Sequence, residues 1–110
     1  MAFQSAKEIF ETKISQKLKT DPDVAKAVGA LVLFHITGAT PENWVLDCSK
    51  NPAVVKSGAV EGAALEVTVA EGDFVKLANG ELNPQMAFLG GKLKVKGNMG
   101  LAIKLGKILT

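Results

Sequence analysis

The sequence predicts an α+β domain in which helices cover one face of a mixed β-sheet. At both ends of the chain, apolar residues recur at the spacing of a helix. Between these ends lie several short segments in which apolar and polar residues alternate, as they do in β-strands. A helical stretch also separates the last two alternating runs, which favours pairing those two strands in parallel. The 110 residues are close to the commonest size for one domain, so residues 1–110 are expected to fold as a single unit.

Two helices are expected before the first strand. Ser5 begins the first with a capping-box pattern, and apolar residues then recur at helical spacing as far as Leu18. Asp21 and Pro22 supply an N-cap and a first-turn proline for a second, shorter helix. Gly29 is placed to end it.

Four alternating segments predict the first strands of the sheet. Residues 31–36 and 43–48 flank a turn that contains glycine and proline, a pattern typical of a β-hairpin. Residues 53–56 fit a short edge strand, and residues 64–69 alternate again. Because successive side chains of a strand point to opposite faces, His35 lies on the face opposite the apolar side chains of its strand. The hairpin side chains expected to point into the core are Val32, Phe34, Ile36, Trp44, Leu46 and Cys48.

In the last forty residues the apolar residues again recur at helical spacing, and these helical segments lie before and after one more predicted strand. Residues 71–78 begin with acidic residues, which suit the positive end of a helix dipole, and Asn83-Pro84 begins a short helix through Leu89. Residues 92–96 alternate between lysine and apolar side chains. Residues 99–109 form a final helix whose apolar residues cover more than the ~100° stripe that packing on a sheet requires. Either this helix is fully buried, or a partner protein, a membrane or an apolar ligand covers it.

The distribution of charged residues indicates which kinds of molecule this protein could bind. All thirteen cations are lysines, and the absence of arginine argues against sequence-specific nucleic-acid recognition. After Glu81 the chain has no acidic residue and five lysines. These lysines form either an ordinary solvated surface or a surface that contacts anionic lipid headgroups transiently.

No constellation of catalytic residues is recognisable. His35 and Cys48 are the only imidazole and the only thiol, and they fall on opposite predicted faces, which argues against a Cys–His dyad. A single cysteine cannot form an intramolecular disulfide and suits a reducing compartment. Neither a zinc site of several Cys and His residues nor a phosphate-binding loop fits the sequence. We therefore expect neither an enzyme nor a cofactor or metal.

The C-terminal third contains a specific set of motifs, namely Asn83–Phe88, Gly91–Ala102 and Lys104-Leu105. Shorter segments precede them in order, namely Phe34–Ile36, Trp44–Asp47 and Asp73-Phe74. Together these segments resemble the sterol carrier protein 2 (SCP-2) family, whose characteristic end the C-terminal third matches. The resemblance covers essentially the whole chain. It implies a five-stranded, mostly antiparallel sheet, about five helices, and a hydrophobic tunnel between sheet and helices.

The resemblance also implies a function and a location. Proteins of this family bind fatty acids, fatty acyl-CoA, sterols or phospholipids, and carry them between membranes or to peroxisomal enzymes. The chain is then expected to be a monomeric carrier in the peroxisome, or otherwise in the cytoplasm. Many relatives end in a Ser-Lys-Leu type address, whereas this chain ends Ile108-Leu109-Thr110.

We hypothesise a lipid-binding lining of apolar residues from sheet and helices, with Gln85 offering a polar group near the mouth. The apolar residues are Phe34, Ile36, Trp44, Leu46, Phe74, Leu77, Met86, Phe88, Leu89, Ile103, Leu105 and Ile108. For each of them the alternative is plain core packing, and for Gln85 it is a place in the helix cap. Two other functions stay open. One is an interaction or dimerisation module that docks through its apolar C-terminal helix, and the other is an acyl-CoA thioesterase.

Overall fold

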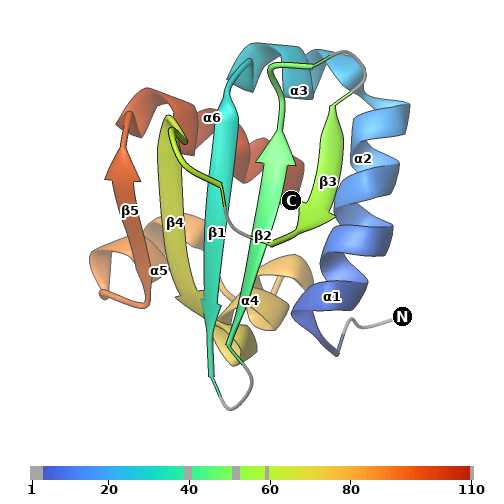
Figure 1. The fold of residues 1–110 in the computed structure, drawn as a ribbon. Coiled ribbons are helices and arrows are strands. Elements are labelled where there is room, and N and C mark those ends of the chain that lie inside the picture. Colours follow the sequence, from blue (N-terminus) through green and yellow to red (C-terminus); the bar gives the residue numbers. More distant parts are fainter. Residues whose placement is uncertain (1–3, 39–40, 51–52, 59, 110) are drawn as a thin grey trace.

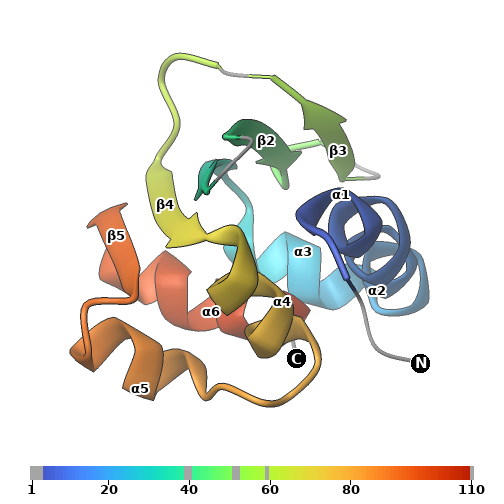
Figure 2. The same cartoon turned by 90° about the horizontal axis from the view of Figure 1, so that it is seen from below.

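Five strands form one sheet in the order β3-β2-β1-β4-β5, and the helices lie on one side of it (Figures 1 and 2). The computed structural model describes residues 4–38, 41–50, 53–58 and 60–109, except for the side chains of residues 84, 102 and 106–109. The strands are β1 (Leu31–Thr37), β2 (Glu42–Asp47), β3 (Val54–Ser57), β4 (Leu65–Ala70) and β5 (Leu93–Gly97). The helices are α1 (Ala6–Glu8), α2 (Ser15–Thr20), α3 (Pro22–Val28), α4 (Glu71–Ala78), α5 (Pro84–Leu89) and α6 (Met99–Leu109).

The sheet is mixed and mostly antiparallel, which confirms the expected fold class. β1 pairs antiparallel with β2 and parallel with β4, in the register Phe34↔Trp44 and Phe34↔Val67. The predicted parallel pairing of the last two strands is wrong, because β4 and β5 are antiparallel. Their connection contains two short helices, α4 and α5, and it brings the chain back to the end of the sheet where β4 stops. The parallel pair arises instead because the chain passes from β3 to β4 across the face that the helices leave uncovered (Figure 2).

A continuous helical stretch precedes β1 and contains an unpredicted π-helical turn, η1 (Ile9–Ile14), between α1 and α2. The Ser15 hydroxyl donates a hydrogen bond to the Phe10 carbonyl at 2.9 Å, five residues back along this widened turn. With α3 to α6, the described residues therefore contain five helical stretches, as expected for the family. None of the described helices is both long enough and apolar enough to cross a membrane.

Most of the predicted helix caps form. The Ser5 hydroxyl accepts a hydrogen bond from the Glu8 amide at 3.2 Å, and Gly29 ends α3 in the left-handed conformation with φ of 58°. The predicted side-chain cap at Asp21 is wrong, because that residue makes no capping hydrogen bond. Its ψ of 74° departs from the extended backbone that capping residues typically adopt, as Ser5 does with ψ of 159°.

The core lies between the inner face of the sheet and the helices. Alternate side chains of β1, β2 and β4 point toward the helices, and the apolar residues predicted at these positions are all buried. The described residues include no buried polar or charged side chain. The interior of the described chain is therefore wholly apolar.

Candidate functional site

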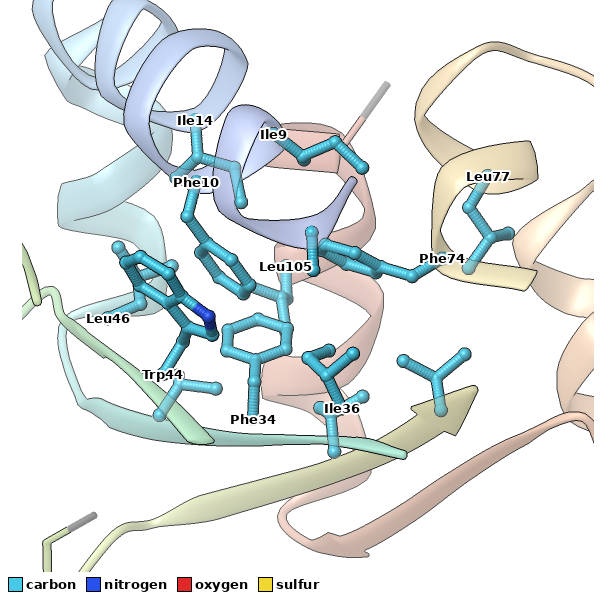
Figure 3. Close-up of a cluster of buried hydrophobic side chains, with 14 of the residues drawn as sticks. Ile9, Phe10, Ile14, Phe34, Ile36, Trp44, Leu46, Phe74, Leu77 and Leu105 are labelled. Carbon is cyan, nitrogen blue, oxygen red and sulfur yellow. The ribbon is translucent and has the colours of Figure 1, made fainter. Parts of the chain in front are cut away.

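Seven of the predicted lining residues meet in the core between the sheet and the helices (Figure 3). They come from β1, β2, α4 and α6, and each is at most 5% exposed. They are Phe34, Ile36, Trp44, Leu46, Phe74, Leu77 and Leu105. The sheet residues converge because they alternate on neighbouring strands, and the α4 pair converges because residues three apart share a helix face.

Four aromatic rings form the centre of this core. The Phe10 ring stacks on Trp44 with ring centroids 4.9 Å apart and on Phe74 at 5.1 Å. It meets the edge of Phe34 at 5.0 Å. Figure 3 shows Phe10 entering from the first helical stretch, between the rings of the sheet and that of α4. Phe10 thus contacts every other ring of the cluster.

Phe10 is the site residue that sequence reasoning missed. Its helical spacing placed it on the buried face of the first helix, but nothing in that pattern connected it with Trp44 or Phe74. Two hydrogen bonds also join the first helical stretch to α4. The Ala6 amide donates to the Glu71 carboxylate at 3.2 Å, and the Lys13 ammonium donates to the Ala78 carbonyl at 3.0 Å.

Trp44 carries the only indole in the sequence and is 5% exposed. Its Nε1–H donates to the Glu42 carboxylate at 2.9 Å, so the polar end of the ring is satisfied at the rim of the core. The apolar part of the ring is left free to pack in the interior. Trp44 is therefore a natural fluorescent reporter for this core.

The remaining predicted lining residues lie elsewhere. Met86, Phe88 and Leu89 on α5 and Ile103 on α6 are exposed, and Gln85 is exposed as well. The Gln85 amide donates to the Asn83 side chain at 2.8 Å, so the backbone of Gln85 belongs to the helix cap. The side chain of Ile108 lies outside the described residues. The structure thus separates the hypothesised lining into an interior set and a surface set.

His35 and Cys48 lie on opposite faces of the sheet. On the uncovered face, the two ring nitrogens of His35 lie 3.0 Å from the Asn43 side-chain oxygen and 3.1 Å from a Glu66 carboxylate oxygen. Cys48 belongs to the core, on the helix side. The sheet therefore separates imidazole from thiol, and the two cannot act as a nucleophile–base pair.

We expect the Cys48 thiol to react slowly. Burial, with a smaller effect from the Asp47 charge, raises the pKa of this thiol from 9.0 to about 11. At pH 8 that change lowers the thiolate fraction roughly 100-fold. Native protein mixed with an aromatic disulfide reagent should therefore react at least ~10-fold more slowly than urea-unfolded protein, because the greater nucleophilicity of a high-pKa thiolate offsets only part of its lower fraction. Its rate should keep rising with pH beyond 9. Equal rates for the native and unfolded forms would contradict this assignment.

The comparisons with known proteins agree with one another. The SCP-2 sterol transfer family matches residues 7–110. Non-specific lipid-transfer protein-like 1 of Caenorhabditis elegans is 34% identical over 111 residues, which is 99% of this chain and 92% of that protein. Hydroxysteroid dehydrogenase-like protein 2 of Homo sapiens is 44% identical over 89 residues, 80% of this chain. The aligned part is 21% of that longer protein, so the chain spans about a fifth of the length of such relatives.

A solved structure shares the fold. Sterol carrier protein-2 from Aedes aegypti, in complex with the C16 fatty acid palmitate, aligns with a TM-score of 0.76 and 25% identity. The alignment covers 94% of this chain and 92% of that one. The arrangement of sheet and helices is therefore also found in a protein whose structure was solved in complex with a fatty acid.

Proposed function

Because this chain belongs to the SCP-2 sterol transfer family, we propose that it is a lipid carrier that holds an acyl chain between its sheet and its helices. Fatty acids are the first ligands to test. Fatty acyl-CoA, sterols and phospholipids follow from the family resemblance. Carriage between membranes, or to enzymes that consume these lipids, would be its role.

The observation that carries this proposal is the wholly apolar interior. Seven lining residues from sheet and helices belong to one core cluster with Phe10, and no polar side chain is buried among the described residues. Each methylene that leaves water for such an interior gains about 0.8 kcal/mol. An acyl chain would then bind through its length, with little selection for the head group. In the structure described here the aromatic rings fill the centre of the core, so the chain would enter by moving them apart.

We expect palmitate to change the fluorescence of Trp44 in delipidated protein. The indole belongs to the ring cluster that the acyl chain would displace, so the change should saturate at one palmitate per chain. A fatty acid that carries a nitroxide on its chain should quench the same emission. Affinity should rise about fourfold for each added methylene until the chain exceeds the interior.

Two controls accompany this titration. Trp44→Phe keeps an aromatic side chain at this position but removes the fluorescent indole, so binding should persist by calorimetry while the fluorescence change disappears. Acetate, which lacks the chain, should leave the emission of the wild type unchanged. An unchanged Trp44 spectrum together with no heat of palmitate binding would refute lipid carriage.

The carrier role requires no catalytic group in this chain. The sheet separates His35 from Cys48, and the proposal assigns chemistry to neither. If acyl-CoA were hydrolysed, and if hydrolysis stopped on replacing His35 or Cys48, the thioesterase alternative would replace the carrier proposal. For longer relatives that contain a similar domain, we propose the same lipid-holding role for that domain alone.

The proposed compartment is the peroxisome, and this rests on the family resemblance alone. A fluorescent fusion of the full-length protein, imaged with a peroxisomal marker, tests it. Co-localisation would support the peroxisome, and diffuse signal would favour the cytoplasmic alternative.

The second candidate function is an interaction module, and the exposed apolar residues of α5 and α6 favour it. Such a module would use these helices to dock on an enzyme or on another copy of the chain. Native mass spectrometry of freshly purified protein separates the two functions. Retained lipid on a monomer supports carriage, whereas a lipid-free dimer supports assembly.

A further inference from the structure

β5 forms one edge of the sheet, and no described strand pairs with its outer side (Figure 1). At the other edge, the shorter strand β3 lies beside the helical stretch that precedes β1 (Figure 1). A free edge carries backbone N–H and C=O groups that can pair with a strand of another chain. β5 is therefore the more open of the two edges.

The backbone groups that face this free edge can be assigned from the pairing with β4. Where that pairing ends, the Asn98 amide donates to the Ala64 carbonyl at 3.4 Å. Because backbone groups of successive strand residues point to opposite sides, Lys96 and Lys94 also turn theirs toward β4. The N–H and C=O of Val95, and of the residues two positions before and after it, therefore turn toward the free edge.

The side chains of β5 are less well covered than those of β4. Every inward residue of β4 is buried, whereas the inward residues of β5, Leu93 and Val95, are only half-buried against the core. Lys94 and Lys96 alternate with them and are exposed on the other face of the sheet. A strand added at this edge would cover the open sides of Leu93 and Val95 with its own inward side chains.

The exposed face of β5 is positively charged. Lys94 lies opposite Thr68 of β4, and Lys96 lies opposite Glu66, which is the only carboxylate that β4 places opposite β5. A carboxylate oxygen of Glu66 is 3.1 Å from a ring nitrogen of His35. Neither lysine forms a salt bridge with the described residues. The edge therefore offers two ammonium groups on one face to whatever strand lies beside it.

These charges decide which kind of strand fits. A second copy that paired through the same edge would bring the lysines of both copies together, and like charges on neighbouring strands repel. An acidic segment instead places its carboxylates beside the two ammonium groups. Because Leu93 and Val95 line the opposite face, the residues between those carboxylates need to be apolar.

We propose that the free edge of β5 binds an extended segment of a partner protein in which acidic and apolar residues alternate. The backbone of this segment pairs with that of Val95 and its neighbours two positions away. Its acidic side chains lie beside Lys94 and Lys96, and its apolar side chains cover Leu93 and Val95. The proposal goes beyond lipid carriage and does not depend on it, because β5 contributes no residue to the hypothesised lipid lining.

The test uses the whole protein and a capped peptide, Val-Glu-Val-Glu-Val-Glu-Val, with the solvent exchange of each backbone amide measured by NMR. With the peptide at about ten times its dissociation constant, the Val95 amide should exchange about tenfold more slowly, because a peptide carbonyl accepts its hydrogen bond. The Lys94 and Lys96 amides already face β4 and should change little. An unprotected Val95 amide at about 1 mM peptide would overturn the proposal.

Altered peptides separate backbone pairing from charge. The valines are the peptide residues whose backbone would face β5, so N-methylation of the valines should abolish the protection, whereas N-methylation of the glutamates should preserve it. Replacing the glutamates by lysines should lower the affinity at least ~10-fold, because each new ammonium group would lie beside Lys94 or Lys96. Equal binding of the two N-methylated peptides, or of the lysine peptide and the glutamate peptide, would contradict the assignment.

A charge reversal in the protein completes the test. Lys94→Glu with Lys96→Glu should lower the affinity for the glutamate peptide at least ~10-fold and make the lysine peptide the better ligand. The matched control is Lys7→Glu with Lys19→Glu, which changes the net charge equally at two exposed lysines beside the other edge of the sheet. The control should bind the glutamate peptide like wild type. An equal loss in both double variants would reduce the effect to general charge attraction and overturn the proposal.

Two further measurements exclude other roles for this edge. Palmitate binding, followed through Trp44, should be unchanged in both double variants, and its loss in the β5 variant alone would place the lysines in the lipid site instead. Sedimentation of the wild type without peptide should give a monomer. A dimer in which the Val95 amide is already protected would make this edge a contact between copies and overturn the assignment of an acidic partner.

Discussion

Phe10→Ala should lower the free energy of unfolding by about 4 kcal/mol, one of the largest effects of any single substitution in this chain. The Phe10 ring is fully buried and contacts Phe34, Trp44 and Phe74 with ring centroids about 5 Å apart. Truncation removes those contacts and leaves a cavity at the centre of the core. Urea unfolding gives the change directly, and the melting temperature should fall by roughly 15 °C.

The same variant also tests the lipid site. Palmitate should raise the melting temperature of Phe10→Ala more than that of wild type, since the acyl chain would occupy the volume that the ring vacates. Phe88→Ala is the matched control, because it deletes the same atoms from a side chain that is 39% exposed and should cost about 1 kcal/mol. If palmitate stabilised wild type and Phe10→Ala equally, the acyl chain would not lie against this ring.

Gly97→Ala should also destabilise the fold by about 4 kcal/mol. Gly97 ends β5 with φ of 119°, a conformation that side chains rarely adopt, and it lies opposite Leu65 of β4. A Cβ atom there would overlap the backbone oxygen of Ala64, and backbone cannot move aside as a flexible side chain can. The variant should therefore weaken the end of the β4–β5 pairing, which urea unfolding and amide exchange would both report.

Two other glycines separate the causes of this effect. Gly91 has φ of 78° but no atom within 4 Å of an added Cβ, so Gly91→Ala should cost about 1 kcal/mol from backbone strain alone. Gly72 lies in α4 with ordinary φ and open space, so Gly72→Ala should stabilise by about 0.5 kcal/mol. Similar losses at Gly97 and Gly91 would show that the contact with Ala64 is unimportant.

The sheet half of the candidate site could be predicted from the sequence. Phe34 and Ile36 are two residues apart on one strand, and Trp44 and Leu46 are two residues apart on another, so each pair shares a face of the sheet. Because only one face of the sheet is covered, apolar side chains at these positions must point toward that face. The helical half could be predicted only in part. Phe74, Leu77 and Leu105 are buried as expected, but the residues that project from α5 and from the outer side of α6 are exposed. An apolar residue on a nearly all-apolar helix carries no local signal for which side the rest of the fold covers.

The sequence by itself determined the α+β class, the inward residues of each strand, the helix caps at Ser5 and Asn83, and the family. These depend on side-chain spacing within one segment or on motifs along the chain. Only the tertiary structure decided that β4 and β5 are antiparallel, that Phe10 joins the rings of β1, β2 and α4, and that Leu89 and Ile103 face outward. Each of these depends on how separate segments pack together, and no pattern within a single segment encodes that.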